Sequence, residues 1–186
     1  VFPLALFLIF CVIGFTFRTY SQPILLLLLI PFSLTTVAWG HLVHGFPVNV
    51  ISLLGVIALV GILVNDGLVL ISKFNSNLRS GKSYDESLFG AGKERFRAIF
   101  LTSITTMAGL APIIFEKSFQ AQLLKPMAIS IAYGIGYATF LTLILLPILL
   151  SLTNSLKLNF VWLRSGIKLE KRDVEAPVIE INREKK

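Results

Sequence analysis

Residues 48–71 read VNVISLLGVIALVGILVNDGLVLI, and this stretch decides the fold. It carries a single charged side chain, Asp66, and is otherwise almost entirely aliphatic. A helix needs about 20 apolar residues to cross the hydrocarbon core of a bilayer, so the stretch predicts a membrane-spanning helix. The whole composition agrees, because 55% of the 186 residues are hydrophobic and only 15% are charged. We therefore expect an integral membrane protein.

Four other apolar blocks accompany this stretch. Together they predict an all-α, polytopic transmembrane helix bundle with spans at residues 1–17, 23–40, 48–71, 98–115 and 124–152. A signal peptide is the alternative for the first block, but the basic start and the small-residue cleavage site of such a peptide are missing from it. Gly134 and Gly136 should allow close approach of a neighbouring helix. Beyond the last span we expect a polar, disordered tail over residues 153–186.

Lys and Arg collect in alternate connections. The connection at 72–97 holds six of them and the tail holds eight, whereas the connection HLVHGFPVN at 41–49 holds none. Because cytoplasmic loops are enriched in Lys and Arg, the first span should enter from outside and the C-terminus should lie in the cytoplasm. Topology then accounts for the net charge of +7. We expect contact with membrane lipid and no nucleic-acid partner.

The connection before the fourth span predicts a short amphipathic helix over residues 83–96. Ser83, followed by Asp85 and Glu86, is typical of a helix start. Leu88 and Phe89 should face inward, and the basic end should continue into the span. Arg97 stands at that junction, where its side chain could either snorkel to the headgroups or point inward.

Asp66 is the candidate functional residue. Placing an aspartate at the centre of a spanning helix costs roughly 2.5 to 3.5 kcal/mol, so a partner, a water cavity or a proton has to compensate. Burial favours the neutral form of a carboxyl group, and a switch that binds and releases a proton is the functional interpretation. The alternative is a fixed structural hydrogen bond. Asn65, the next residue, makes the position more polar still.

A second polar feature is the hydroxyl stripe of the fourth span. Thr102, Thr105 and Thr106 recur at helical spacing. Such a face suits interhelical hydrogen bonds, or it could line a water or proton path, and the spacing favours neither. His41 and His44 are expected to be polar loop residues at a membrane edge. The sequence holds no catalytic constellation, metal-spaced cluster or cofactor motif, so we expect no enzyme, no metal and no cofactor.

Residues 48–115 resemble the late transmembrane helices of the resistance-nodulation-division efflux transporters. The polar pair after the run GILVN at 61–65, the small-residue helix containing AG, and the segment RFRAIFLTSITTMAGLAPI at 95–113 carry the resemblance. It implies the last five spans of a twelve-span, proton-driven export permease of the multidrug-resistance type in the bacterial inner membrane. The N-terminal part of the permease would be a partner, within a homotrimer that works with a periplasmic adaptor and an outer-membrane channel.

The resemblance also suggests roles for single residues. Asn65 and Asp66 stand where the best-known drug exporters of the family carry Lys-Asn, so a cation is missing here and Asp66 would take the proton itself. Arg97 matches an arginine at the cytoplasmic start of the eleventh span, and Thr102 to Thr106 match its hydroxyl-bearing stretch. These residues would form a proton relay with Asn65 as the orienting partner. The alternatives are a truncated product, which the start without Met favours, or a non-transporting membrane scaffold.

Overall fold

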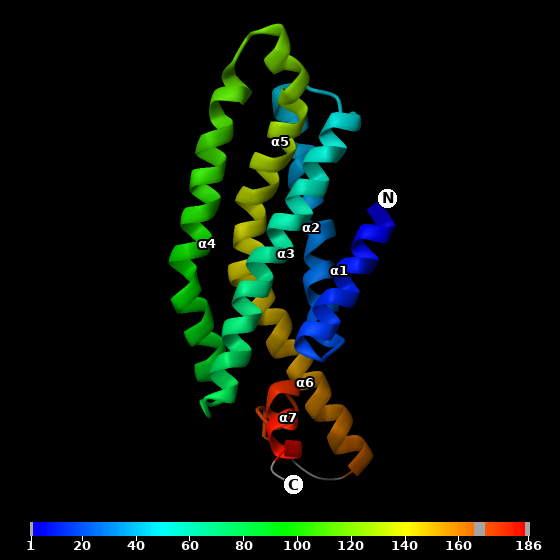
Figure 1. Ribbon diagram of the computed structural model, residues 1–186, viewed down its shortest axis with the longest axis vertical. Helices are drawn as coiled ribbons and strands as arrows, with labels where there is room; N and C mark the ends of the chain where they lie inside the picture. Colours follow the sequence, from blue (N-terminus) through cyan, green and yellow to red (C-terminus); the bar gives the residue numbers. More distant parts are fainter. Residues whose placement is uncertain (1, 166–169, 185–186) are drawn as a thin grey trace. The chain divides into compact units, whose positions relative to one another are not determined.

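The computed structural model describes residues 2–165 and 170–184. Within these ranges it consists of helices and their connections, as the sequence predicts (Figure 1). The elements are α1 (Phe2–Phe17), α2 (Ser21–His44), α3 (Val50–Arg79), α4 (Tyr84–Phe115), α5 (Phe119–Phe140), the π-helical turn η1 (Leu141–Leu145), α6 (Leu146–Ser165) and α7 (Ala176–Glu184).

Four helical stretches are long and apolar enough to cross a membrane, judged by length and composition. They are Ser21–His44, Val50–Arg79, Tyr84–Phe115 and Phe119–Leu163, the last running through α5, η1 and α6. The first expected span is a helix as well, but α1 is shorter than the others. Its 16 residues would extend about 24 Å at 1.5 Å per residue, somewhat less than the hydrocarbon thickness of about 30 Å.

Helix α4 runs from Tyr84 to Phe115 without a break, so the amphipathic helix continues into the fourth span as the sequence predicts. Its start has the expected polar chemistry. The Glu86 backbone N–H donates to the Ser83 hydroxyl at 3.3 Å, and the Ser83 backbone N–H donates to the Glu86 carboxylate at 3.2 Å. This reciprocal pair is a capping box. Leu88 is buried as expected, but the prediction for Phe89 was wrong: one step around the helix, Phe89 is 77% exposed.

The C-terminal region differs from the disordered tail that the sequence suggests. Helix α6 extends to Ser165, and α7 covers Ala176–Glu184. Val174 and Val178 are buried, and so is the charged residue Glu175 between them. The segment therefore has buried side chains, which its polar composition conceals.

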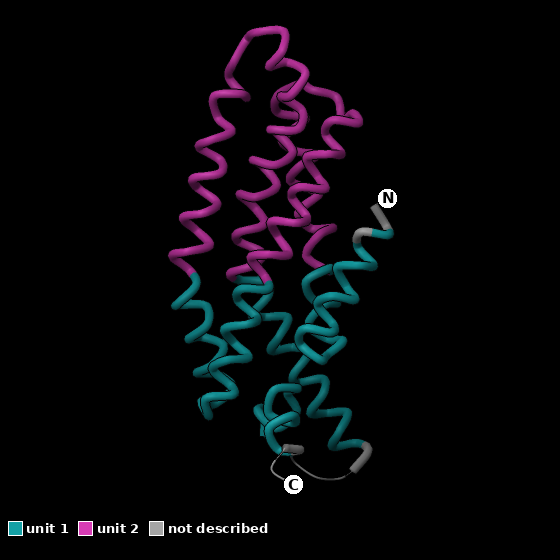
Figure 2. Tube along the Cα trace, viewed as in Figure 1, with its two compact units in different colours: residues 1–27, 68–95, 144–186 teal, residues 28–67, 96–143 magenta. Residues whose placement is uncertain are grey.

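The chain divides into two compact units (Figure 2). Unit 1 comprises residues 1–27, 68–95 and 144–186, and unit 2 comprises residues 28–67 and 96–143. In unit 1 the fully buried side chains include Phe74, whose ring meets Tyr84 edge-on at 5.4 Å. In unit 2 they include Leu59 and Ile129.

Unit 2 packs α3 against α5 through glycines. A Cβ atom on Gly55 would lie only 2.7 Å from the Met127 carbonyl oxygen, and one on Gly134 would collide with the side chain of Leu59. Gly134 therefore has the role that the sequence predicts for it. Gly136 allows a similar approach to Met107 of α4, whose sulfur would be 3.2 Å from an added Cβ. Small residues of this kind let helix backbones come close where no water drives association.

Candidate functional site

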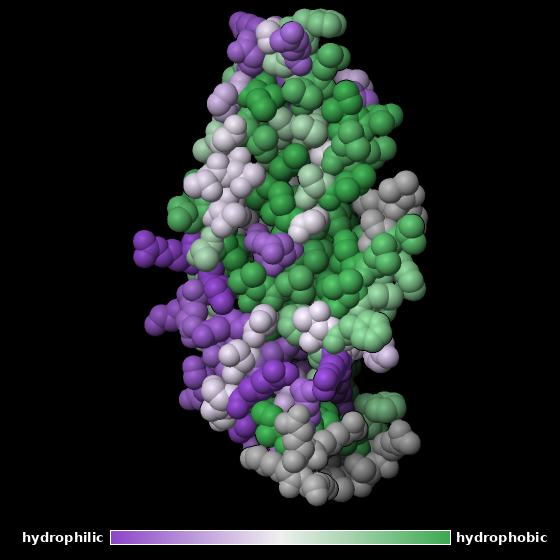
Figure 3. Space-filling view, in the orientation of Figure 1, coloured by the Kyte–Doolittle hydropathy of each residue, from purple (hydrophilic) through white to green (hydrophobic). Residues whose placement is uncertain are grey.

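Asp66 lies on α3 in unit 2, and its side chain is buried at 8% exposure. Its neighbours along the helix, Val64 and Gly67, are buried too. The face of the molecule drawn in Figure 3 is largely hydrophobic over its middle part, and many large apolar side chains of α2, α3 and α4 are exposed. A carboxyl group in such surroundings has lost most of its water, so a proton, a partner or both must compensate for it.

Asn65, the residue before Asp66 on α3, is exposed, and its amide lies close enough to act on the Asp66 carboxyl group. Among the described residues, no Lys, Arg or His forms an ion pair with Asp66. The arrangement can hold a proton on Asp66 and can orient the group through Asn65.

The hydroxyls of the three threonines on α4 form hydrogen bonds within their own helix. Each donates its hydroxyl to a carbonyl of its own helix: Thr102 to Ala98 at 2.7 Å, Thr105 to Leu101 at 2.9 Å, and Thr106 to Thr102 at 2.8 Å. Thr102 and Thr105 are exposed, and Thr106 is half-buried. None of these bonds reaches Asp66 or another helix of the described chain.

Ser103 makes the interhelical contact instead. It is buried, and the Thr139 hydroxyl of α5 donates to the Ser103 oxygen at 2.5 Å. Sequence reasoning missed Ser103 because hydroxyls cover more than one face of TSITT, and spacing cannot show which face meets α5. The signal available was Gly136, which marks the side of α5 that α4 approaches.

Arg97 is exposed at the beginning of the apolar part of α4. Within the described ranges it forms no salt bridge. The structure therefore places Asn65 beside Asp66. In the described ranges, neither a salt bridge of Arg97 nor a hydrogen bond of the three threonines reaches these two residues.

The two histidines were also assigned wrongly. They occupy the last turn of α2, and His41 is only 3% exposed. The His41 ring bonds to the Ser130 hydroxyl at 2.9 Å and to the Phe46 carbonyl at 3.1 Å, while His44 Nε2 lies 3.1 Å from the Tyr133 hydroxyl. Because a carbonyl only accepts, Nδ1 of His41 donates to Phe46. Continuing the apolar helix through HLVH would have placed both rings on one face, three residues apart.

Unit 1 contains a buried polar pair that sequence reasoning did not find. Gln22 of α2 and Asn75 of α3 exchange two amide hydrogen bonds, each 3.0 Å long. Both side chains are buried. The reciprocal geometry satisfies one donor and one acceptor on each amide, which makes the pair compatible with an apolar interior.

With this geometry in view, the chain can be compared with known proteins. A family model described as "AcrB/AcrD/AcrF family" matches residues 1–154. The cobalt-zinc-cadmium resistance protein CzcA of Cupriavidus metallidurans is 30% identical over 154 residues, which cover 83% of this chain and 14% of that protein. The multidrug resistance protein MdtC of Serratia proteamaculans is 25% identical over 163 residues, 87% of this chain and 16% of that one.

The fold has a counterpart among solved structures. The X-ray crystal structure of a heavy metal efflux pump superposes with a TM-score of 0.75 at 27% identity, covering 83% of this chain and 16% of that one. The chain thus spans about one seventh of the length of the curated relatives it matches. The apolar helices and these relatives together make it a multi-pass membrane protein that belongs to the AcrB/AcrD/AcrF family of resistance-nodulation-division efflux transporters.

Proposed function

We propose that this chain forms part of a proton-driven export permease and supplies helices that couple proton movement to export. The observation that carries the proposal is the buried carboxyl group of Asp66, which has no basic ion-pair partner among the described residues. A group of this kind is suited to taking up a proton when buried and releasing it when water reaches it. The family assignment and the likeness to the solved structure of a heavy metal efflux pump support export as the outcome.

In this proposal Asp66 binds the proton and Asn65 orients its carboxyl group. Arg97, Thr102, Thr105 and Thr106 continue the relay toward helices outside this chain. The exposure of α4 supports these roles: in the 18-residue apolar stretch of this helix, only 11% of the residues are buried. The threonine hydroxyls already donate to their own helix, so they would act as acceptors toward such a neighbour.

The surroundings of the permease follow from the same proposal. The chain would lie in the bacterial inner membrane with its C-terminus in the cytoplasm, and would act together with the remaining N-terminal part of the permease. A homotrimer with a periplasmic adaptor and an outer-membrane channel is the proposed assembly. The names of the relatives mention both metal and multidrug resistance, so the proposal covers export and leaves the substrate open.

The test is export by the full-length permease carrying Asp66→Asn, reconstituted in liposomes with an imposed pH gradient. We expect proton-driven export to be lost, because the amide keeps the shape of the carboxyl group but cannot carry the proton. Glu116→Gln is the matched control: it removes an exposed carboxylate from the α4–α5 connection and should leave export unchanged. Unchanged proton-driven export in Asp66→Asn would overturn the assignment. It would then favour the alternative that Asp66 makes a fixed structural hydrogen bond.

A further inference from the structure

The segment 170–184 is tied to several helix ends of unit 1. Lys171 pairs with Asp85 at the start of α4, and Glu180 pairs with both Arg18, after α1, and Arg79, at the end of α3. These contacts join parts of the chain that lie as far as 162 residues apart in sequence. The segment also lies beyond residues 1–154, which the family model matches.

One contact of the segment is buried and acts as its anchor. The Glu175 side chain is only 4% exposed and accepts from Lys157 Nζ at 3.2 Å and from Asn154 Nδ2 at 2.7 Å, both on α6. Asn154 also donates to the Lys171 carbonyl at 2.7 Å. Buried charge-assisted bonds of this kind are strong and poorly screened by salt.

The remaining ion pairs are exposed. The side chains of Lys171 and Asp85 are 52% and 60% exposed, and those of Arg18 and Arg79 are also largely in solvent. Exposed pairs are individually weak, worth at most about a fivefold change in an equilibrium, and salt screens them.

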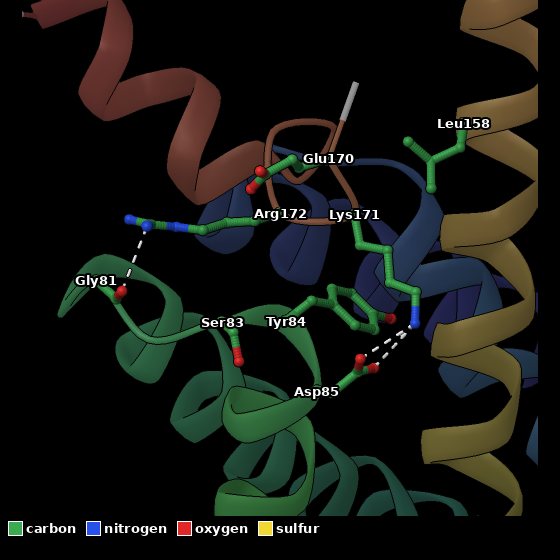
Figure 4. A pocket seen from close by; sticks show the side chains of 8 residues that line it. All are labelled: Gly81, Ser83, Tyr84, Asp85, Leu158, Glu170, Lys171 and Arg172. Carbon is green, nitrogen blue, oxygen red and sulfur yellow. Dashed lines mark hydrogen bonds and ion pairs between the residues drawn. The ribbon is translucent and has the colours of Figure 1, made fainter. Parts of the chain in front are cut away.

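Packing between the segment and the start of α4 is loose. A pocket of about 590 Å³ is lined by Tyr84 and Asp85 on one side and by Glu170, Lys171 and Arg172 on the other (Figure 4). Across it, Arg172 donates to the Gly81 carbonyl at 3.3 Å, beyond the end of α3. Arg172 also donates to the Leu78 carbonyl at 3.5 Å in a part-buried position, and a cation is favourable at a helix C-terminus. Glu175 is thus the buried charged contact of the segment, while its ion pairs with Asp85, Arg18 and Arg79 involve exposed partners.

We propose that residues 170–184 form a clasp that responds to ionic strength. Glu175 keeps the clasp attached to α6, while the Lys171–Asp85 and Glu180 contacts fasten it to the ends of α3 and α4 at low salt and release them at high salt. In its closed form the clasp restrains the α3–α4 connection. The inference stands on these contacts and does not depend on proton coupling by Asp66.

The test measures distances between spin labels in the full-length permease. Labels are attached through Ser80→Cys, beside the α3–α4 connection, and Ile179→Cys, on α7, in a Cys11→Ser background; both label positions are exposed. Between about 0.1 M and about 1 M NaCl the screening length falls from about 10 Å to about 3 Å. We expect one narrow distance at low salt and a broad, longer distribution at high salt. A narrow distance that does not change with salt would overturn the proposal.

Exchanging the charges of Lys171 and Asp85 tests whether this pair itself fastens the clasp, as opposed to a general effect of salt on the segment. Lys171→Asp or Asp85→Lys alone should shift the population toward the longer distances at low salt, by about the fivefold that one exposed pair is worth, and the double exchange should restore the narrow distance. Glu175→Gln should broaden the distribution at every salt concentration, because the anchor itself is weakened. If the double exchange behaves like the single ones, the Lys171–Asp85 pair does not fasten the clasp.

Discussion

Unit 1 and unit 2 are held together by different chemistry. All five salt bridges found in the described ranges lie in unit 1, which also holds the buried Gln22–Asn75 pair. Unit 2 relies on glycine contacts and on neutral hydrogen bonds such as that between Thr139 and Ser103. The difference teaches that one chain can join its helices in two ways. In unit 2 the absence of a side chain lets α3 and α5 approach closely, whereas in unit 1 paired polar side chains connect the helices, both in the interior and at the surface.

The largest expected effect tests the role of volume in unit 2. Gly55→Ala places a Cβ atom against the Met127 carbonyl and the Ser130 side chain. The backbone of α5 would have to move, so we expect a loss of about 2 to 3 kcal/mol in the free energy of unfolding. Thermal unfolding of the purified protein in detergent should show a clearly lower midpoint.

Gly61→Ala is the matched control on the same helix, because no atom lies within 4 Å of the added Cβ. Alanine has the better helix propensity by up to about 1 kcal/mol, so this variant should unfold at the same temperature or higher. Equal midpoints for the two variants would show that the approach of α3 to α5 is not limited by volume.

The next effect tests polar pairing in unit 1. Gln22→Leu leaves the Asn75 amide buried without its partner, which should cost about 2 kcal/mol. Replacing both, as Gln22→Leu with Asn75→Leu, removes the unsatisfied groups together and should recover most of the loss. Unfolding midpoints of the unmodified protein, Gln22→Leu, Asn75→Leu and the double variant form a double-mutant cycle. A double variant with the sum of both single losses would mean that shape, not pairing, matters here.

The smallest effect concerns the start of α4. Ser83→Ala removes the hydroxyl that accepts from the Glu86 N–H, a change worth about 1 kcal/mol. Hydrogen exchange of the amides in the first turn of α4 should become faster, while Ser76→Ala on the exposed face of α3 should leave them unchanged. Unaltered exchange in Ser83→Ala would show that tertiary contacts, rather than the cap, fix this end.

The sequence predicts local features well. The apolar blocks identify the helical regions, the Ser83–Glu86 spacing marks the start of α4, and Gly134 signals a close helix contact, because each depends on neighbours along the chain. Asp66 stands out because a charge in an aliphatic run is costly wherever its partners lie.

Features that depend on a second helix could not be predicted. The hydroxyls of Thr102 and Ser103 are equivalent in the sequence, yet only Ser103 meets α5. His41 looks like a loop residue until Ser130, 89 positions later, comes within 2.9 Å of its ring. In the sequence Glu175 is one residue of a polar tail, and only the fold places it beside Asn154 and Lys157. Whether Asn65, Arg97 and the α4 threonines carry protons stays a prediction.

At Arg18, in the turn between α1 and α2, the backbone conformation is unfavourable while the side chain forms a favourable ion pair. Its φ of +49° lies in the left-handed region, where an L-residue other than glycine or asparagine is strained by about 1 kcal/mol or more. Glycine would relieve this strain but would remove the guanidinium that meets Glu180. Since an exposed pair contributes at most about 1 kcal/mol, the two effects nearly cancel. The turn therefore adds little net stability. Its effect is to place the charge of Arg18 beside Glu180, at the expense of an unfavourable backbone conformation.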